Sequence, residues 1–86
     1  MLQKQEAMAS VAESPGIERA AEFLRLALPL MTRHGVPVTP QNYAIWYSYV
    51  NGDNPELNAE VDRLIGEQRQ FTEVINAQLY RQYVAE

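Results

Sequence analysis

The chain has 86 residues, enough for one domain, and a domain of this size buries only about 60–65% of its unfolded surface. Its 7 Lys and Arg against 11 Asp and Glu give a formal net charge of −4, which repels polyanions and argues against nucleic-acid binding. The absence of cysteine excludes disulfides and thiolate metal sites. So small a core stabilises a fold only weakly. We therefore expect the domain to gain stability by binding a second copy of itself or another partner.

The N-terminal end differs in character from the rest of the chain. Residues 1–13 mix polar and scattered apolar side chains without a helix cap, which predicts a flexible N-terminal arm. Ser14-Pro15-Gly16 then marks the start of a helical domain over residues 14–86. No apolar run approaches the roughly 20 residues of a membrane span, and no signal-peptide core is present. We therefore expect a cytoplasmic location and no membrane contact.

The first predicted helix runs from Ile17 to about Arg33, because apolar residues recur there every three or four positions. Leu26 and Leu30 fall off the main stripe, so the apolar surface is wider than one core requires and indicates a second contact. Pro29 predicts a bend, since proline removes one backbone hydrogen bond inside a helix. The main stripe consists of Ile17, Ala20, Ala21, Phe23, Leu24, Ala27, Leu28 and Met31.

The stretch from His34 to Pro55 predicts a short helix that is rich in aromatic residues. Thr39 can cap this second helix, and Pro40 suits its first position because the missing N–H has no partner to lose there. Gly52 can end the helix after Asn51 by adopting the left-handed conformation. The helix carries four of the eight aromatic residues of the chain, Tyr43, Trp46, Tyr47 and Tyr49.

Two further helices follow. Asn54 is the cap residue of a third helix, which runs from Pro55 to about Glu67. Thr72 is the cap residue of a fourth helix, which runs from Glu73 to at least Val84. No stop signal follows the fourth helix, so we expect it to run off the C-terminal end. The inward positions are Leu57, Val61, Leu64 and Ile65 in the third helix and Val74, Ile75, Leu79, Tyr80, Tyr83 and Val84 in the fourth. The chain therefore predicts an all-α fold, a small antiparallel bundle of about four helices.

The apolar surface left over on the first two helices leads to three hypotheses. The first is a homodimer whose interface contains Leu26, Leu30, Ile45 and Tyr49. The second is a sensing module in which a small molecule binds in a pocket formed by Tyr43, Trp46 and Tyr47 against the bent first helix. The third is a docking surface for another protein, which would use the same apolar residues. Aromatic residues at helical spacing more often serve packing than ligand binding.

Residues that could carry catalysis are scarce. The single histidine, His34, lies at a predicted helix end, where a cation complements the helix dipole. Asp53 and Glu56 suit the N-terminus of the third helix for the same reason, and the acidic set that they form with Glu60 and Asp62 has no calcium-loop spacing. The four glycines are isolated, which excludes a glycine-rich phosphate loop. We expect no catalytic residue, metal or cofactor in this chain.

The motifs of the central region resemble a known family. The segment LPLMTRHGVPVTPQNYAIWYSYVNGDNPELNAEVDRLI resembles the helical N-terminal domain that precedes the GGDEF domain in some bacterial diguanylate cyclases. The resemblance covers about residues 20 to 84. Its matching residues are Gly35, Pro37 to Pro40, Asn42, Tyr43, Trp46, Tyr47, Gly52, Asn54, Pro55, Leu57, Phe71, Thr72 and Tyr80.

The resemblance implies a regulatory or dimerisation module in cyclic-di-GMP signalling, followed by a GGDEF domain in the same polypeptide. The chain itself contains no GG(D/E)EF motif and no inhibitory RxxD site of such a catalytic domain, so none of those residues can be assigned here. By itself, this part of the protein is expected not to be an enzyme.

Overall fold

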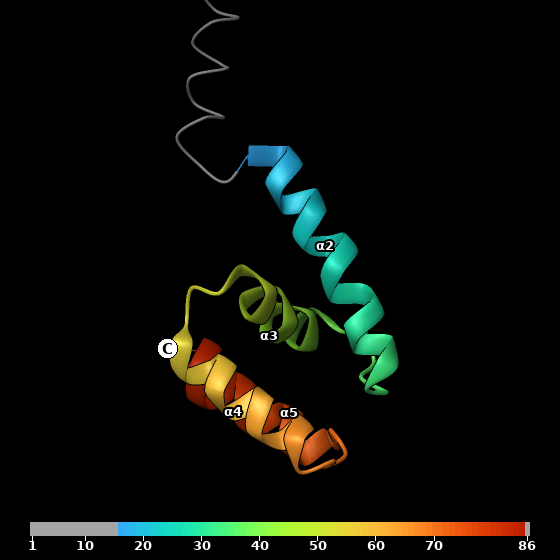
Figure 1. Ribbon diagram of the computed structural model, residues 1–86, viewed down its shortest axis with the longest axis vertical. Helices are drawn as coiled ribbons and strands as arrows, with labels where there is room; N and C mark the ends of the chain where they lie inside the picture. Colours follow the sequence, from blue (N-terminus) through green and yellow to red (C-terminus); the bar gives the residue numbers. More distant parts are fainter. Residues whose placement is uncertain (1–15, 86) are drawn as a thin grey trace, which may run out of the picture.

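The computed structural model describes residues 16–85, and these residues are helical apart from short connections. The elements are α2 (Gly16–Arg33), α3 (Pro40–Asn51), α4 (Pro55–Gly66), α5 (Glu73–Leu79) and the π-helical turn η1 (Tyr80–Val84), as Figure 1 shows. The predicted all-α fold of four helices is therefore confirmed. The predicted arm at residues 1–13 and the cap at Ser14 lie outside the described residues.

The N-caps of α3, α4 and α5 are those that the sequence predicts. The side chain of Thr39 accepts a hydrogen bond from the backbone N–H of Asn42, and Asn54 does the same for Leu57. Thr72 caps α5 in the same way. Gly52 ends α3 in the left-handed conformation at φ 77°. Each of these three helix starts thus satisfies one amide that has no partner inside the helix.

Helix α3 lies at the centre of the fold and contacts α2, α4, α5 and η1 (Figure 1). Its Ile45 and Trp46 are fully buried, together with side chains from the two helices on either side of it in sequence. The buried core consists of Ala27, Met31, Val36, Ile45, Trp46, Leu57, Val61, Leu64, Phe71 and Leu79. Burial of these apolar side chains holds the elements together, at roughly 25 cal/mol for each Å² removed from water.

Helix α2 is only partly covered by the rest of the described chain. Ala27 and Met31 are its only fully buried residues. The helix continues through Pro29 without a break. Figure 1 shows the N-terminal half of α2 extending past α3. The reason is length, because the 18 residues of α2 span about 27 Å and the 12 residues of α3 about 18 Å.

The last helical segment changes form before it ends. After Leu79 the helix widens into the π-helical turn η1, in which the N–H of Ala85 bonds the carbonyl of Tyr80 at 2.7 Å. Ala85 is extended, with φ −74° and ψ 147°. The sequence pattern predicts helix through this region without a stop, and the widened turn followed by extended backbone is the difference that the structure adds.

Candidate functional site

The aromatic residues of α3 form part of the core and leave no open binding box. The indole ring of Trp46 has no exposed surface and is enclosed by three other rings. The ring of His34 stacks on the indole with 5.5 Å between the ring centroids. Phe71 and Tyr49 meet the indole edge to face, with centroid distances of 5.3 and 5.4 Å. These contacts make Trp46 a packing residue, and they give His34 a packing partner where the sequence predicts only a helix-end cation.

The other two residues of the predicted pocket lie at the junction of α2 and α3. Tyr47 packs edge to face against Phe23 at 5.4 Å and against Tyr43 at 5.7 Å. All three rings are half-buried. Tyr43, Trp46 and Tyr47 therefore do not come together around a shared hollow, because Trp46 points into the core while the two tyrosines face α2.

The four residues predicted for an interface are spread over different environments. Ile45 is fully buried in the core, so it has no surface to offer a partner chain. Leu30 and Tyr49 are half-buried and pack against the same core. Leu26 alone is well exposed, at 52%. The structure thus corrects the placement of Ile45, because α3 is packed between α2, α4, α5 and η1 and Ile45 lies inside the fold.

Of the five large apolar side chains that are exposed among the described residues, two, Ile17 and Leu24, lie along one edge of the N-terminal half of α2. Ile17 is 80% exposed and Leu24 is 40% exposed, although both belong to the stripe expected to face inward. Ala21 and Leu28, which share this edge of the helix, are half-buried. The four positions follow a 4-3-4 spacing, which is the spacing by which two helices pack in a coiled coil. We call this set, Ile17, Ala21, Leu24 and Leu28, the α2 stripe.

Sequence reasoning placed the α2 stripe in the core because periodicity shows which side of a helix is apolar and not how far its neighbour reaches. A signal was nevertheless present. The first predicted helix is about half as long again as the second, so part of its apolar side was bound to lack a neighbour there. Leu26 lies on the opposite edge of α2 and is separate from the stripe.

Polar contacts tie α4 to the elements beside it. The hydroxyl of Tyr49 donates a hydrogen bond to Asp62 at 2.5 Å, and Asn58 donates to the backbone carbonyl of Tyr49 at 3.0 Å. Burial of Tyr49, together with its bond to Asp62 and the negative charge there, raises the pKa of the tyrosine to about 12. The hydroxyl of Ser48 likewise donates a hydrogen bond to Asp53 at 2.7 Å. Both acidic residues, Asp53 and Asp62, thus accept hydrogen bonds from side chains of α3.

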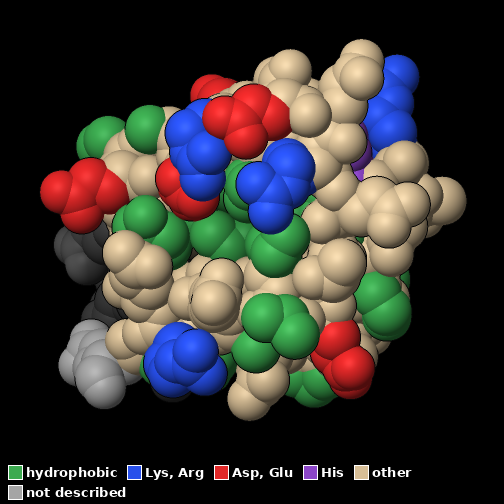
Figure 2. All heavy atoms as spheres, turned by 90° about the horizontal axis from the view of Figure 1, so that it is seen from below, with side chains coloured by type: hydrophobic (Ala, Val, Ile, Leu, Met, Phe, Trp, Pro, Cys, Tyr) green, Lys and Arg blue, Asp and Glu red, His purple; other side chains and the backbone are tan. Residues whose placement is uncertain are grey.

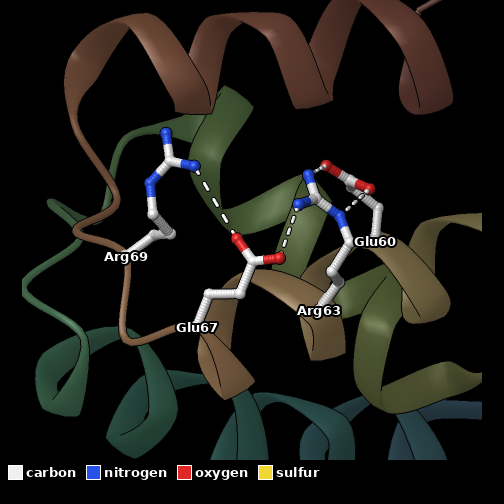
Figure 3. Close-up of polar contacts among 4 residues, drawn as sticks. All are labelled: Glu60, Arg63, Glu67 and Arg69. Atoms are coloured by element: carbon white, nitrogen blue, oxygen red, sulfur yellow. Dashed lines mark hydrogen bonds and ion pairs between the residues drawn. The ribbon is translucent and has the colours of Figure 1, made fainter.

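A second polar group lies on the surface of α4 and the turn after it. Arg63 donates to Glu60 at 2.6 Å and to Glu67 at 3.0 Å, and Arg69 approaches Glu67 at 3.8 Å (Figure 3). The bond from Arg63 lowers the pKa of Glu60. All four side chains keep contact with water, so the pairs add little to stability. Figure 2 shows the same mixing of basic and acidic side chains on one face of the molecule.

Pockets that bind small ligands enclose about 300 to 1,000 Å³. A hollow of about 620 Å³ lies between the α2–α3 connection and the start of α5. Asn76 lies in its wall, only 4% exposed, and its side-chain oxygen has no hydrogen-bond partner among the described residues. The hollow is lined by Gly35, Pro37, Thr39, Gln41, Asn42, Phe71, Glu73, Asn76 and Ala77. We call it the Asn76 hollow.

Two kinds of site are absent from the described residues, 16–85. No three His, Asp or Glu side chains there lie close enough together to hold a metal ion. None of the helices there combines the length and apolar character needed to cross a membrane.

Comparison with known proteins gives one informative match. The chain is 42% identical over 68 residues to the diguanylate cyclase VdcA of Vibrio cholerae serotype O1, strain El Tor Inaba N16961. The match takes in 79% of this chain and spans only 20% of the length of that relative. No protein-family model and no solved structure matches the chain. Over most of its length the chain is thus similar to a small part of a diguanylate cyclase, which confirms the resemblance predicted from its sequence.

Proposed function

We propose that the chain is a non-catalytic regulatory and dimerisation domain of a diguanylate cyclase, acting in cyclic-di-GMP signalling by positioning or controlling a C-terminal GGDEF domain. The observation that carries the proposal is the 42% identity to one fifth of a diguanylate cyclase. The chain has no GG(D/E)EF motif, so the catalytic step belongs elsewhere in the full-length protein.

A dimerisation domain would act by raising the effective concentration of one catalytic domain near the other. The product joins two GTP molecules, and two catalytic domains that each hold one GTP have to meet across a two-fold axis. A dimerising neighbour makes this encounter intramolecular. The α2 stripe is the surface that suits this task best, because it is apolar and spaced for helix pairing and because Ile17 and Leu24 are exposed to solvent.

The first test of the proposal is the coding sequence that follows Glu86. An in-frame GGDEF domain is the expected result. A stop codon directly after Glu86 in the natural gene would contradict the proposal.

The second test uses the full-length enzyme and follows the synthesis of cyclic di-GMP from GTP. The double substitution Ile17→Asp with Leu24→Asp should lower the rate at least about tenfold at nanomolar enzyme, because the effective concentration is lost. Raising the enzyme concentration should restore part of the rate. Val74→Asp is the matched control, since Val74 is 66% exposed on α5 and lies outside the stripe. Equal rates for the native enzyme and the double variant would contradict the role in dimerisation.

A second candidate function is the sensing of a small molecule. The Asn76 hollow favours it, because a buried amide oxygen without a partner is costly and a ligand donor could satisfy it. Small amides and amines that carry an N–H donor are suitable probes in an NMR titration. Shifts confined to the amides of Phe71, Glu73 and Asn76 would support sensing, and the absence of shifts at millimolar probe would exclude this class of ligand.

A further inference from the structure

Asn54 is the one side chain among those described that links a helix start to the end of η1. Its oxygen accepts a hydrogen bond from the backbone N–H of Leu57 at 3.2 Å, which caps α4. Its amide nitrogen donates a hydrogen bond to the backbone carbonyl of Tyr83 at 3.2 Å. In sequence, Tyr83 lies 29 residues from Asn54 and Leu57 lies three residues from it. Both contacts are partly buried.

The carbonyl of Tyr83 needs a partner from outside its own helix. Carbonyls in the last turn of a helix have no N–H ahead of them to bond, and Tyr83 is the second-last residue of η1. A π-helical turn is also rare, and it persists where tertiary contacts favour it. Here the turn packs on α3, with Tyr80, Tyr83 and Val84 against the core.

The same turn ends at the point where the backbone becomes extended. The N–H of Ala85 bonds the carbonyl of Tyr80, and Ala85 itself is extended. A residue that fixes the carbonyl of Tyr83 therefore acts next to the point where helix gives way to extended backbone.

We propose that Asn54 is a latch, a positioning residue that holds η1 in its π-helical form and couples the α3–α4 turn to the exit of the chain at Ala85. Capping alone does not require asparagine, because Asp and Ser serve equally well at the start of a helix. The amide nitrogen is the part of Asn54 that the latch needs, since a carboxylate or hydroxyl at this position lacks the N–H donor that reaches Tyr83.

Asn54→Asp separates the two roles of the side chain. The carboxylate keeps the cap and suits the positive end of the helix dipole, but it cannot donate to the carbonyl of Tyr83. Asn58→Asp is the matched control. Asn58 lies in α4, the helix that Asn54 caps. The substitution makes the same change of charge and removes the donor to a different carbonyl, that of Tyr49.

Hydrogen exchange of individual backbone amides, followed by NMR on the 86-residue chain, tests the latch. In Asn54→Asp the amide of Ala85 should exchange at least about fivefold faster than in the native chain, while the amide of Leu57 stays protected. In Asn58→Asp the amide of Ala85 should keep its native rate. The carbonyl carbon of Tyr83 should shift in the first variant only.

Two results would overturn the latch. One is an amide of Ala85 that exchanges within about twofold of the native rate in Asn54→Asp. The other is an equal acceleration in both variants, which would mean that the added charge on α4, and not the lost donor, loosens the turn. The test uses this chain alone, so its outcome is independent of whether the chain serves a cyclase.

Discussion

Tyr49 shows how a single side chain can join two helices and respond to pH. Its hydroxyl bonds Asp62 across the α3–α4 contact, and its pKa is raised to about 12 by burial first and by Asp62 second. In the unfolded chain a tyrosine ionises near pH 10. The folded state therefore holds this proton more tightly than the unfolded state does.

The pH dependence of stability follows from that difference. Between about pH 10 and 12 the unfolded chain binds fewer protons than the folded chain, so the free energy of unfolding falls as pH rises. The contribution of Tyr49 is complete below pH 10. Tyr49→Phe keeps the ring and removes the titrating group, so its stability should fall less steeply over this range. Urea unfolding followed by circular dichroism at several pH values measures both slopes, and equal slopes would contradict the assignment.

Burial of individual residues was only partly predictable from the sequence. Leu57, Val61 and Leu64 are buried as their helical spacing predicts. Ile45 and Leu26 are both apolar and off the main stripes, yet one is fully buried and the other 52% exposed. Periodicity assigns a residue to a side of its helix, and the number of neighbours on that side depends on tertiary packing. A charged residue in place of Ile45 is therefore expected to destabilise the fold, because the side chain is fully buried.

At the scale of the helices, the turns between them are fixed by local chemistry. Gly52 has φ 77°, which suits glycine and strains other residues. Gly66 has no such conformation and ends α4. Neither position has an atom within 4 Å of an added Cβ, so a substitution at either site changes the backbone preference without creating a clash.

This pair of glycines gives a matched test of the turns. Gly52→Ala should lower the free energy of unfolding by about 1 to 2 kcal/mol, because alanine adopts the left-handed conformation poorly. Gly66→Ala should leave it unchanged or raise it by up to about 1 kcal/mol, since alanine favours helix. Chemical denaturation of both variants measures the difference. A loss of equal size in the two variants would show that Gly52 has no special backbone role.

The helix boundaries were predictable because caps, prolines and glycines act within a few residues of one another. The last segment was predicted less well. The sequence from Tyr80 to Val84 has an ordinary helical pattern, while its π-helical form depends on packing against α3 and on the distant Asn54. Contacts between residues so far apart in sequence leave no local signal.

At the scale of the whole molecule, the fold is small, and α2, the longest of the described helices, is incompletely covered by the other described residues. A domain of this size gains little net stability from its own core, so apolar surface left on α2 is surface that a second copy could use. Pairing of two α2 stripes would bury Ile17 and Leu24 and, under the proposed function, would bring two catalytic domains into one dimer. The proposal that the chain is a dimerisation domain depends on this pairing.

Sedimentation equilibrium of the 86-residue chain tests the pairing most directly. The native chain and Val74→Asp should sediment as dimers at micromolar to millimolar concentration. The double variant Ile17→Asp with Leu24→Asp should sediment as a monomer with the helical content of the native chain. A native chain that stays monomeric at the highest concentration, or a double variant that dimerises as well as Val74→Asp, would contradict the account.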